Sequence, residues 1–365
     1  MCLDFGDEGF ADSVEEFVQL AESAGATRHA LVKGGRNHPD ARLFAGRGKV
    51  EEVAQAAVAL NAACVMFNHE LSGAQQRNLE KELGRRVLDR TALILEIFGQ
   101  RARTSEGKLQ VELAQLEHLS TRLVRGWTHL ERQRGGLGKT GGPGETQLEL
   151  DRRYISQRVR VLRGKLDQLR HRREVQRRAR ARGEVFSVSL VGYTNAGKST
   201  LFNALAHAKA YEADKLFATL DTTTRRIYVP EAGEVVVSDT VGFIRELPHS
   251  LVAAFRATLE ETVRADLLLH VVDSASPSRE RQIADVNGVL AEIGAERVPQ
   301  LQVWNKCDLS GLSPAIERDE CGRISRVILS ARTGAGLGGL REALCEAARE
   351  RASARRAARP QAIPI

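Results

Sequence analysis

Residues 192–200 read GYTNAGKST, and they give the clearest indication of the fold. This stretch follows an apolar run of strand length, VFSVSLV, and it opens a segment with helical character, STLFNALAHA. Glycines let such a turn wrap with its N–H groups facing an anion, and the following helix N-terminus adds partial positive charge. The spacing G-x4-G-K-S between a strand and a helix is that of a phosphate-binding loop. We therefore predict phosphate contacts from Gly192, Tyr193, Thr194, Asn195, Ala196, Gly197, Lys198, Ser199 and Thr200.

Two side chains of this loop carry specific chemistry. Lys198 is expected to reach the β- and γ-phosphates of a nucleotide as a catalytic group, and the Ser199 hydroxyl is expected to ligate Mg²⁺.

Two further stretches supply the switch elements of a nucleotide-dependent protein. FATLD, residues 217–221, lies in a polar loop, and Thr219 is the candidate to ligate Mg²⁺ and to touch the γ-phosphate. DTVG, residues 239–242, ends an apolar strand, which places the Asp239 carboxylate in the second coordination sphere of the metal. Gly242 can present its N–H to the γ-phosphate. The expected contacts from these loops are Phe217, Ala218, Thr219, Leu220, Asp221, Asp239, Thr240, Val241 and Gly242.

Two more motifs follow strands and predict the base. In NKCD, residues 305–308, Asp308 can accept from guanine N1–H and N2–H₂ together, whereas adenine would leave a buried carboxylate unpaired. Asn305 and Lys306 would steady the loop and cover the base. In SAR, residues 330–332, the Ala331 N–H is expected to meet guanine O6. The base contacts are thus Asn305, Lys306, Asp308, Ser330, Ala331 and Arg332, and the nucleotides are GTP and GDP.

The residue after Gly242 is unusual for a nucleotide hydrolase. In the best-known switches a glutamine at this place orients the attacking water, but here it is Phe243, which has no hydrogen-bonding group in its side chain. The free protein should therefore hydrolyse GTP slowly, with the water positioned by another group on this chain or on a partner. Replacing Phe243 by Gln would probe this hypothesis, and a large gain in hydrolysis by the free protein would show that only the side chain is missing.

The chain divides into four segments by pattern. Residues 1–104 alternate short β-like runs, HALVKG and ACVMFN, with helical spacing, which predicts a small α/β domain. Residues 105–182 carry heptad-like apolar stripes on two helices, joined by a glycine-rich tip at 135–144. They favour an antiparallel hairpin, although two such helices could instead dimerise chains. Residues 183–348 hold five near-continuous apolar runs, typical of a doubly wound, mostly parallel sheet. Residues 349–365 are expected to be a basic, disordered tail.

Charge points to a polyanionic partner. The net charge is +7, and residues 145–182 carry thirteen Arg or Lys against five Asp or Glu, a local excess of eight. A solvated helix face would give the same excess. No apolar run is long enough to span a membrane, no secretory signal is evident, and the five cysteines are scattered. We expect a cytoplasmic protein, most simply a monomer.

Taken together, the chain resembles the HflX family of ribosome-associated GTPases, from about residue 15 to about 348. The segments FAGRGKVEE, LSGAQQRNLE, RTSEGKLQVELAQLEHLSTRLVRGWTHLERQRGG, GPGETQLELDRR and DTVGFIRELPHSLVAAFRATLEET carry the resemblance. It implies a TRAFAC-class GTPase with a hydrophobic residue in place of the catalytic glutamine. It also implies binding to the large ribosomal subunit and its RNA, and a role in splitting stalled ribosomes under stress.

Two features depart from the family pattern. Many members carry a further small C-terminal domain, whereas this sequence ends soon after the expected GTPase domain. It is either a short member or a truncated sequence, so contacts made by that domain are not assumed. Switch I reads LDTTTRR, with Thr222 where the family has proline, so Thr222, Thr223 and Thr224 compete with Thr219 for the metal.

Two other functions remain open from the residues alone. One is a GTP-gated binding or assembly factor in which hydrolysis only resets the bound state. The other is an RNA-remodelling ATPase, suggested by the basic helices but opposed by Asp308.

Overall fold

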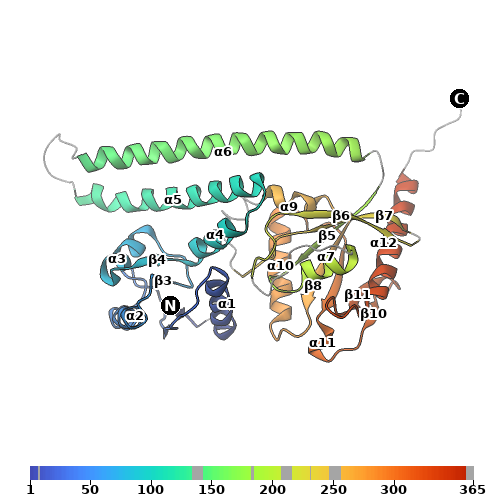
Figure 1. Ribbon diagram of the computed structural model, residues 1–365, viewed down its shortest axis with the longest axis horizontal. Helices are drawn as coiled ribbons and strands as arrows, with labels where there is room; N and C mark the ends of the chain where they lie inside the picture. Colours follow the sequence, from blue (N-terminus) through green and yellow to red (C-terminus); the bar gives the residue numbers. More distant parts are fainter. Residues whose placement is uncertain are drawn as a thin grey trace. The chain divides into compact units, whose positions relative to one another are not determined.

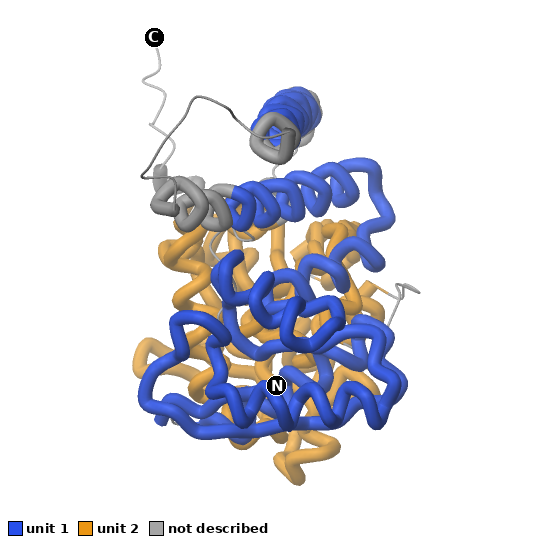
Figure 2. The backbone as a smooth tube through the Cα atoms, turned by 90° about the vertical axis from the view of Figure 1, so that its left-hand side faces the viewer, with its two compact units in different colours: residues 1–171, 248–254 blue, residues 172–247, 255–365 orange. Residues whose placement is uncertain are grey.

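A computed structural model describes residues 1–6, 9–133, 143–181, 185–206, 216–230, 232–245 and 256–358. The chain forms two compact units (Figure 2). The first contains the described residues up to His171, and the second contains those from Arg172 onward. We expected residues 1–104 and 105–182 to form separate domains. Within the first unit, the small α/β domain and most of the helical segment pack together.

The first unit begins with a small α/β layer. Its elements are β1 (Cys2–Asp4), α1 (Phe10–Ser23), β2 (Lys33–Gly35), α2 (Arg47–Ala59), β3 (Cys64–Met66), α3 (Gly73–Leu83), β4 (Arg86–Leu88) and α4 (Arg90–Arg101). β1 pairs with β2 and β3 pairs with β4, both in parallel, as the alternating pattern predicted. The Met1 ammonium donates to the Met66 carbonyl oxygen at 2.7 Å, and the Asn68 N–H donates to the Met1 oxygen at 3.0 Å, which links the two pairs.

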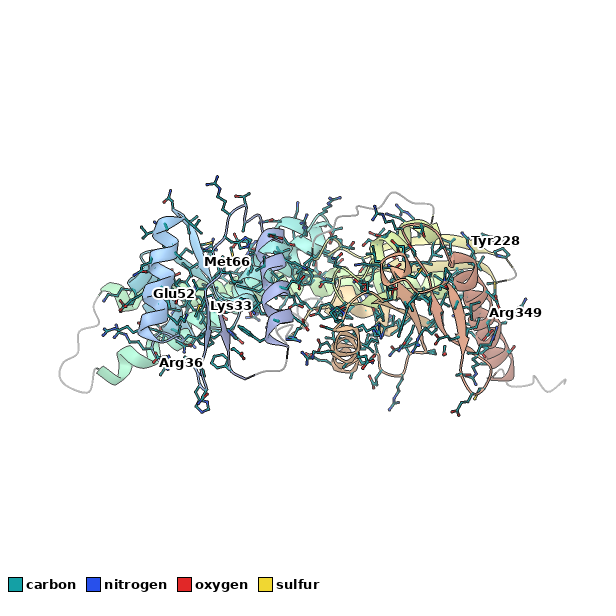
Figure 3. All side chains as sticks on the ribbon, turned by 90° about the horizontal axis from the view of Figure 1, so that it is seen from below. Lys33, Arg36, Glu52, Met66, Tyr228 and Arg349 are labelled. Carbon is teal, nitrogen blue, oxygen red and sulfur yellow. The ribbon has the colours of Figure 1, made fainter. Side chains whose placement is uncertain are left out.

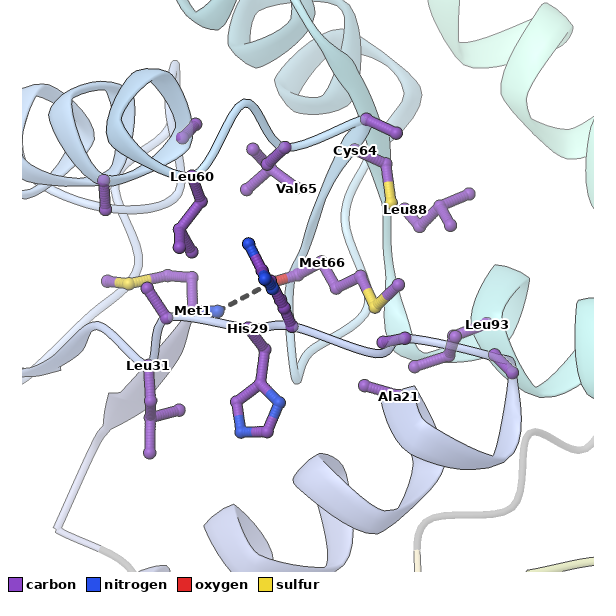
Figure 4. Close-up of a pocket in the computed structure, with 18 of the residues that line it drawn as sticks. Met1, Ala21, His29, Leu31, Leu60, Cys64, Val65, Met66, Leu88 and Leu93 are labelled. Atoms are coloured by element: carbon purple, nitrogen blue, oxygen red, sulfur yellow. Dashed lines mark hydrogen bonds between the residues drawn. The ribbon is translucent and has the colours of Figure 1, made fainter.

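The strand predicted at HALVKG is shorter than expected. Only Lys33–Gly35 pair with β1, and the pairing starts at Cys2. Residues 27–31 have no strand pairing among the described residues and line an apolar cavity of about 510 Å³ (Figure 4). Met1 and Leu60 also line it.

The two long helices are α5 (Ser105–Gln133) and α6 (Pro143–Ala181), which lie side by side and run in opposite directions (Figure 1). Arg158 donates to Glu112 at 2.7 Å, and Arg163 donates to Glu117 at 2.7 Å. Ile155 and Leu162 of the expected stripe are buried. This intramolecular arrangement is the predicted hairpin. Most of its glycine-rich tip, residues 135–142, lies outside the described residues.

A buried polar cluster attaches α5 to the α/β layer. Asp89, fully buried, caps α4 by accepting from the Ala92 N–H at 2.8 Å, and it pairs with Arg122 of α5. Burial alone would raise the pKa of Asp89, but His118, Arg122 and the Ala92 N–H together hold it below its usual value. The carboxylate is therefore charged, and it ties two elements together.

The second unit is built on a seven-stranded sheet. Its elements are β5 (Phe186–Gly192), α7 (Lys198–Ala206), β6 (Thr223–Val229), β7 (Gly233–Asp239), α9 (Arg256–Val263), β8 (Leu267–Asp273), α10 (Arg279–Ile293), β9 (Gln300–Asn305), α11 (Cys307–Ser310), β10 (Ala315–Arg318), β11 (Ile324–Ile328) and α12 (Leu337–Ala358). The strand order is β10-β11-β9-β8-β5-β7-β6. The five strands from β11 to β7 are parallel, which confirms the predicted fold class.

Helices cover both faces of this sheet. Leu201 of α7 and Leu340 of α12 join the core formed by Val188 and its neighbours on one face. On the other face Ser189 meets Thr262 of α9, with 3.2 Å between the hydroxyl oxygens, and α10 packs against β5 and β8. Both faces of the parallel strands are buried, which explains their near-continuous apolar runs.

The structure differs from expectation at the edges of this unit. β6 and β10 pair antiparallel to β7 and β11 and were missed because their sequences, TTRRIYV and AIER, are largely polar. Tyr228 of β6 is 76% exposed (Figure 3). The basic tail was expected to be disordered from residue 349, but α12 continues to Ala358, so this prediction was wrong for residues 349–358. Arg351 explains the helix, because it pairs with Asp266 at 2.6 Å and lies over the Phe186 ring.

In the described part of the chain, no helix is both long and apolar enough to cross a membrane.

Candidate functional site

The predicted phosphate loop is a tight turn between β5 and α7. Gly192 has φ 149°, and a Cβ there would lie 2.2 Å from the Val271 carbonyl oxygen. Gly197 has φ 90°, and a Cβ there would lie 2.2 Å from Asn305 Nδ2. Only glycine fits either position. The turn therefore brings the first residues of α7 to the carboxyl edge of the sheet, where ligands of such folds bind.

Lys198 is the first residue of α7 and is buried inside this turn. Its ammonium donates to the Gly192 and Tyr193 carbonyl oxygens at 3.1 and 2.7 Å. Burial lowers the pKa of Lys198 to about 8, and the nearby Asp239 carboxylate opposes the shift. A cation held in such a cradle of main-chain groups suits an incoming phosphate, which would complete its set of acceptors.

Three oxygen-bearing side chains meet at the start of α7. Ser199 Oγ lies 2.7 Å from Thr219 Oγ1 and donates to Asp239 Oδ2 at 2.7 Å. Asp239 is fully buried, and burial raises its pKa against the hydrogen bond from Ser199 and the charge of Lys198. The buried Asp239 Oδ1 has no hydrogen-bond partner among the described residues.

This cluster fits a magnesium ion. Its donors are two hydroxyls and one carboxylate, all oxygen, and an unsatisfied buried carboxylate oxygen would gain from a cation or its water. The described residues contain no group of three His, Cys, Asp or Glu side chains suited to a metal. That is expected for Mg²⁺ in a nucleotide site, where hydroxyls and phosphates supply most ligands.

The structure places Thr219 differently from two of the threonines that compete with it. Thr219 contacts Ser199, whereas Thr223 and Thr224 belong to β6. The Thr224 hydroxyl lies 3.2 Å from Ser238 Oγ, within the sheet. Phe217 and Leu220, on either side of Thr219, are buried and anchor the loop, and Phe217 takes the left-handed φ of 54°.

The DTVG loop packs directly on the phosphate loop. A Cβ at Gly242 would lie 2.9 Å from Thr194 Cα and 3.0 Å from Lys198 Nζ, so the two loops touch through a glycine. The Thr194 N–H donates to the Phe243 carbonyl oxygen at 2.7 Å, and the Phe243 N–H donates to the Gly192 oxygen at 3.1 Å. Phe243 is fully buried. Its side chain belongs to the core and does not line the candidate phosphate site, which sequence reasoning did not foresee.

The candidate base-binding loops meet through Asn305. Its amide donates to the Ala196 carbonyl oxygen at 2.9 Å, and its oxygen accepts from the Ala331 N–H at 2.9 Å. The Ala331 N–H was expected to face guanine O6; in this structure it is donated to Asn305 instead. Ser330 is fully buried, and its hydroxyl accepts from the Thr333 N–H at 3.2 Å.

Asp308 and Arg332 are exposed at the same edge, where they are accessible to a base. Lys306 takes a left-handed φ of 65° and donates to Asp273 Oδ2 at 2.7 Å. Asp273 was missed by sequence reasoning. Its signal was its place as the last residue of the run DLLLHVVD, one strand away from NKCD.

The cavity at the phosphate loop is small, about 60 Å³, and its lining consists of predicted residues from three loops. They are Thr194, Asn195, Gly197, Lys198, Ser199, Thr200, Phe217, Ala218, Thr219, Thr240 and Gly242. Larger cavities lie in the N-terminal unit and beside α12, but neither contains a phosphate-binding turn. The small volume suits this kind of site, because such loops hold phosphates with main-chain groups at a shallow edge.

The carboxyl edge of one mostly parallel sheet carries a phosphate-binding turn, two switch-like loops and two base-specific motifs. This combination defines a P-loop GTPase. Comparisons with known proteins agree. Residues 187–306 match the family described as 50S ribosome-binding GTPase, residues 11–99 match GTP-binding GTPase N-terminal, and residues 101–180 match GTP-binding GTPase Middle Region.

Full-length relatives identify the family. The chain is 55% identical to GTPase HflX of Escherichia coli (strain K12) over 336 residues, which cover 92% of this chain and 79% of that protein. It is 46% identical to GTPase HflX of Caldanaerobacter subterraneus subsp. tengcongensis over 333 residues, 91% of this chain and 76% of that protein. The chain belongs to the HflX family of GTPases, and it is an enzyme that hydrolyses GTP.

A solved structure shares the fold across both units. It is the crystal structure of SsGBP in complex with GDP, with a TM-score of 0.51 and 24% identity, and the match covers 96% of this chain and 97% of that one.

Proposed function

We propose that this GTPase binds the large ribosomal subunit through contacts between its own helical hairpin and ribosomal RNA. Its nucleotide state controls this binding. In this role it would act in the cytoplasm and split or rescue stalled ribosomes under stress. One observation supports the nucleotide-binding component of this proposal. It is the cluster of Ser199, Thr219 and Asp239 beside Lys198, which joins three loops at one point.

The residues of the site have distinct roles in this proposal. Lys198 and the N–H groups of residues 193–200 hold the phosphates, and Gly242 approaches the γ-phosphate through its main chain. Ser199 and Thr219 would hold Mg²⁺, with Asp239 in its second coordination sphere. When bound, Mg²⁺ offsets the negative charge that develops during phosphoryl transfer. Asp308 selects guanine, with Asn305, Lys306 and residues 330–332 forming the rest of the base site.

The position of Phe243 supports dependence on a partner. Because its ring is buried, the residue after Gly242 contributes no group to an attacking water. A site that lacks one positioning element can lose about 10³–10⁵ in rate. The ribosome would restore the rate by ordering the switches or by supplying a group.

Support for an RNA partner comes from α6. Arg152, Arg153 and Arg160 are exposed, and Tyr154 between them is 69% exposed. Arginines neutralise phosphates, and an exposed aromatic ring offers a surface on which a base can stack.

The proposal is tested by GTP hydrolysis with and without large ribosomal subunits, and by co-sedimentation with them in GDP, GTP and a non-hydrolysable analogue. We expect rate stimulation and strongest binding in the GTP-like state. Equal turnover with and without subunits would contradict the proposal. Efficient subunit splitting with the analogue would favour the second candidate, a GTP-gated binding factor reset by hydrolysis. A preference for ATP over GTP would favour an RNA-remodelling ATPase.

A further inference from the structure

The loop after β8 runs beside the NKCD loop because β8 and β9 are parallel neighbours. Asp273 ends β8 directly opposite Asn305, the last residue of β9. The two loops therefore leave the same edge of the sheet together. Of these two loops, only the NKCD loop carries a recognised nucleotide motif.

The Asp273 carboxylate is fixed on both sides. Its Oδ1 accepts from the Ala275 N–H at 3.0 Å, which holds the group against its own loop, and its Oδ2 accepts from Lys306 Nζ at 2.7 Å. Both partners of the ion pair are partly exposed, at 23% for Lys306 and 21% for Asp273. Such a partly exposed pair adds little to folding stability. Its main effect is to fix the position of the Lys306 side chain.

The main-chain conformation of Lys306 depends on stabilising contacts from its surroundings. Its main chain takes the left-handed φ of 65°, which costs a non-glycine residue energy and persists where surrounding contacts enforce it. It directly precedes α11, the single turn that carries Asp308. A change in the main-chain conformation of Lys306 would therefore shift the Asp308 carboxylate, which is the proposed guanine-selecting group.

Ser274, the next residue, contacts both ends of the same segment. Its N–H donates to the Asn305 carbonyl oxygen at 2.9 Å, and its hydroxyl lies 2.9 Å from Ser310 Oγ at the end of α11. Asp273 and Ser274 thus brace the whole stretch from Asn305 to Ser310.

We propose that Asp273 is a positioning residue for guanine selection, which holds Lys306 and, through it, sets Asp308 against the base. This inference rests on the proposed guanine site. It assigns Asp273 no contact with the nucleotide and no part in the chemical step.

The test compares the affinities of GDP and IDP for the full chain and for Asp273→Ala, Lys306→Met and the double variant. IDP lacks the guanine 2-amino group, so the ratio of the two dissociation constants reports how well Asp308 is placed. For Asp273→Ala we expect GDP binding to weaken about tenfold and the GDP preference over IDP to shrink toward one, because a misplaced carboxylate no longer distinguishes them. The double variant should bind GDP no less tightly than the single variant with the lower GDP affinity, since both changes remove the same interaction.

Glu317→Gln is the matched control, because it removes an exposed ion pair with Arg326 in the same unit, away from the nucleotide loops. It should leave both affinities unchanged. An equal loss of GDP and IDP affinity in Asp273→Ala would indicate a general structural effect and overturn the inference. So would a GDP affinity within twofold of wild type, or additive losses in the double variant. Failure of the wild-type chain to prefer GDP over IDP would instead contradict the proposed guanine site itself.

Discussion

Phe243 and Thr194 are joined by a main-chain hydrogen bond of 2.7 Å, in which the Thr194 N–H donates to the Phe243 carbonyl oxygen. Together with the bond from Phe243 N–H to the Gly192 oxygen, it fastens the DTVG loop to the phosphate loop. The residue after the glycine therefore works through its main chain and its buried ring. Movement of one loop must move or break its contact with the other.

Replacing Phe243 by Gln should destabilise the second unit rather than create a faster enzyme. A polar amide would enter a fully buried apolar site, at a cost of about 3 kcal/mol in the free energy of unfolding. Urea unfolding and GTP hydrolysis without ribosomes measure the two effects. Phe243→Leu is the control and should cost less, about 1.5 kcal/mol. A large gain in ribosome-free hydrolysis at unchanged stability would restore the hypothesis formed from the sequence.

Thr219→Ala should lower GTP hydrolysis at saturating Mg²⁺ by about 100-fold, the effect of removing one group that stabilises the transition state. GDP affinity should change little, because the candidate phosphate loop and base site are intact. Thr224→Ala is the control, since Thr224 contacts Ser238 within the sheet. If the Thr224 variant lost activity and the Thr219 variant kept it, the assignment of switch I would be wrong.

His270 makes stability depend on pH. It lies in β8, and burial lowers its pKa to about 4 from an ordinary value of 6.5, while Gln300 opposes the shift. Between about pH 6.5 and pH 4 the unfolded chain binds this proton and the folded chain does not, so stability falls as pH falls. The loss should reach about 3 kcal/mol near pH 4, from 1.36 kcal/mol per pKa unit. Unfolding at several pH values should show a smaller slope for His270→Gln than for the wild-type chain, and an equal slope in the two would contradict this prediction.

Asp89→Asn should destabilise the first unit by about 3–5 kcal/mol. The change removes the charge that pairs with Arg122 and leaves that guanidinium uncompensated where it is mostly buried. Thermal unfolding monitored in the N-terminal unit measures the loss. Glu82→Gln breaks only an exposed pair with Arg42 and should change stability by less than about 0.5 kcal/mol. Equal effects of the two variants would show that the buried cluster does not attach α5.

Arg152→Gln with Arg160→Gln should weaken binding to large ribosomal subunits and make it less dependent on salt. Each arginine that contacts a phosphate contributes about 0.9 to the slope of log affinity against log salt, so the slope should fall by about 2. Arg163→Gln is the control, because Arg163 is already paired with Glu117. An unchanged slope in the double variant would exclude this face of α6 from the RNA contact.

Much of this protein follows from local sequence. The phosphate loop could be predicted because its glycines are required by the main-chain path itself, at Gly192 and Gly197. The parallel strands could be predicted because burial on both faces demands apolar runs. The edge strands β6 and β10 could not, since one strand neighbour lets polar residues remain exposed.

The contacts between segments far apart in the chain could not be predicted from local sequence, because they depend on how the chain folds. Asp273 meets Lys306 because two parallel strands end side by side, and Arg351 orders the end of α12 because Asp266 lies within reach. Phe243 reads in sequence as a missing glutamine, but folding buries its ring and commits its main chain to the phosphate loop. Local sequence motifs were enough to predict the nucleotide chemistry of the chain. Packing decided which side chains face the nucleotide site and which hold its loops in place. The orientation and burial of a side chain depend on neighbours from distant parts of the chain, and a local sequence pattern does not reveal these neighbours.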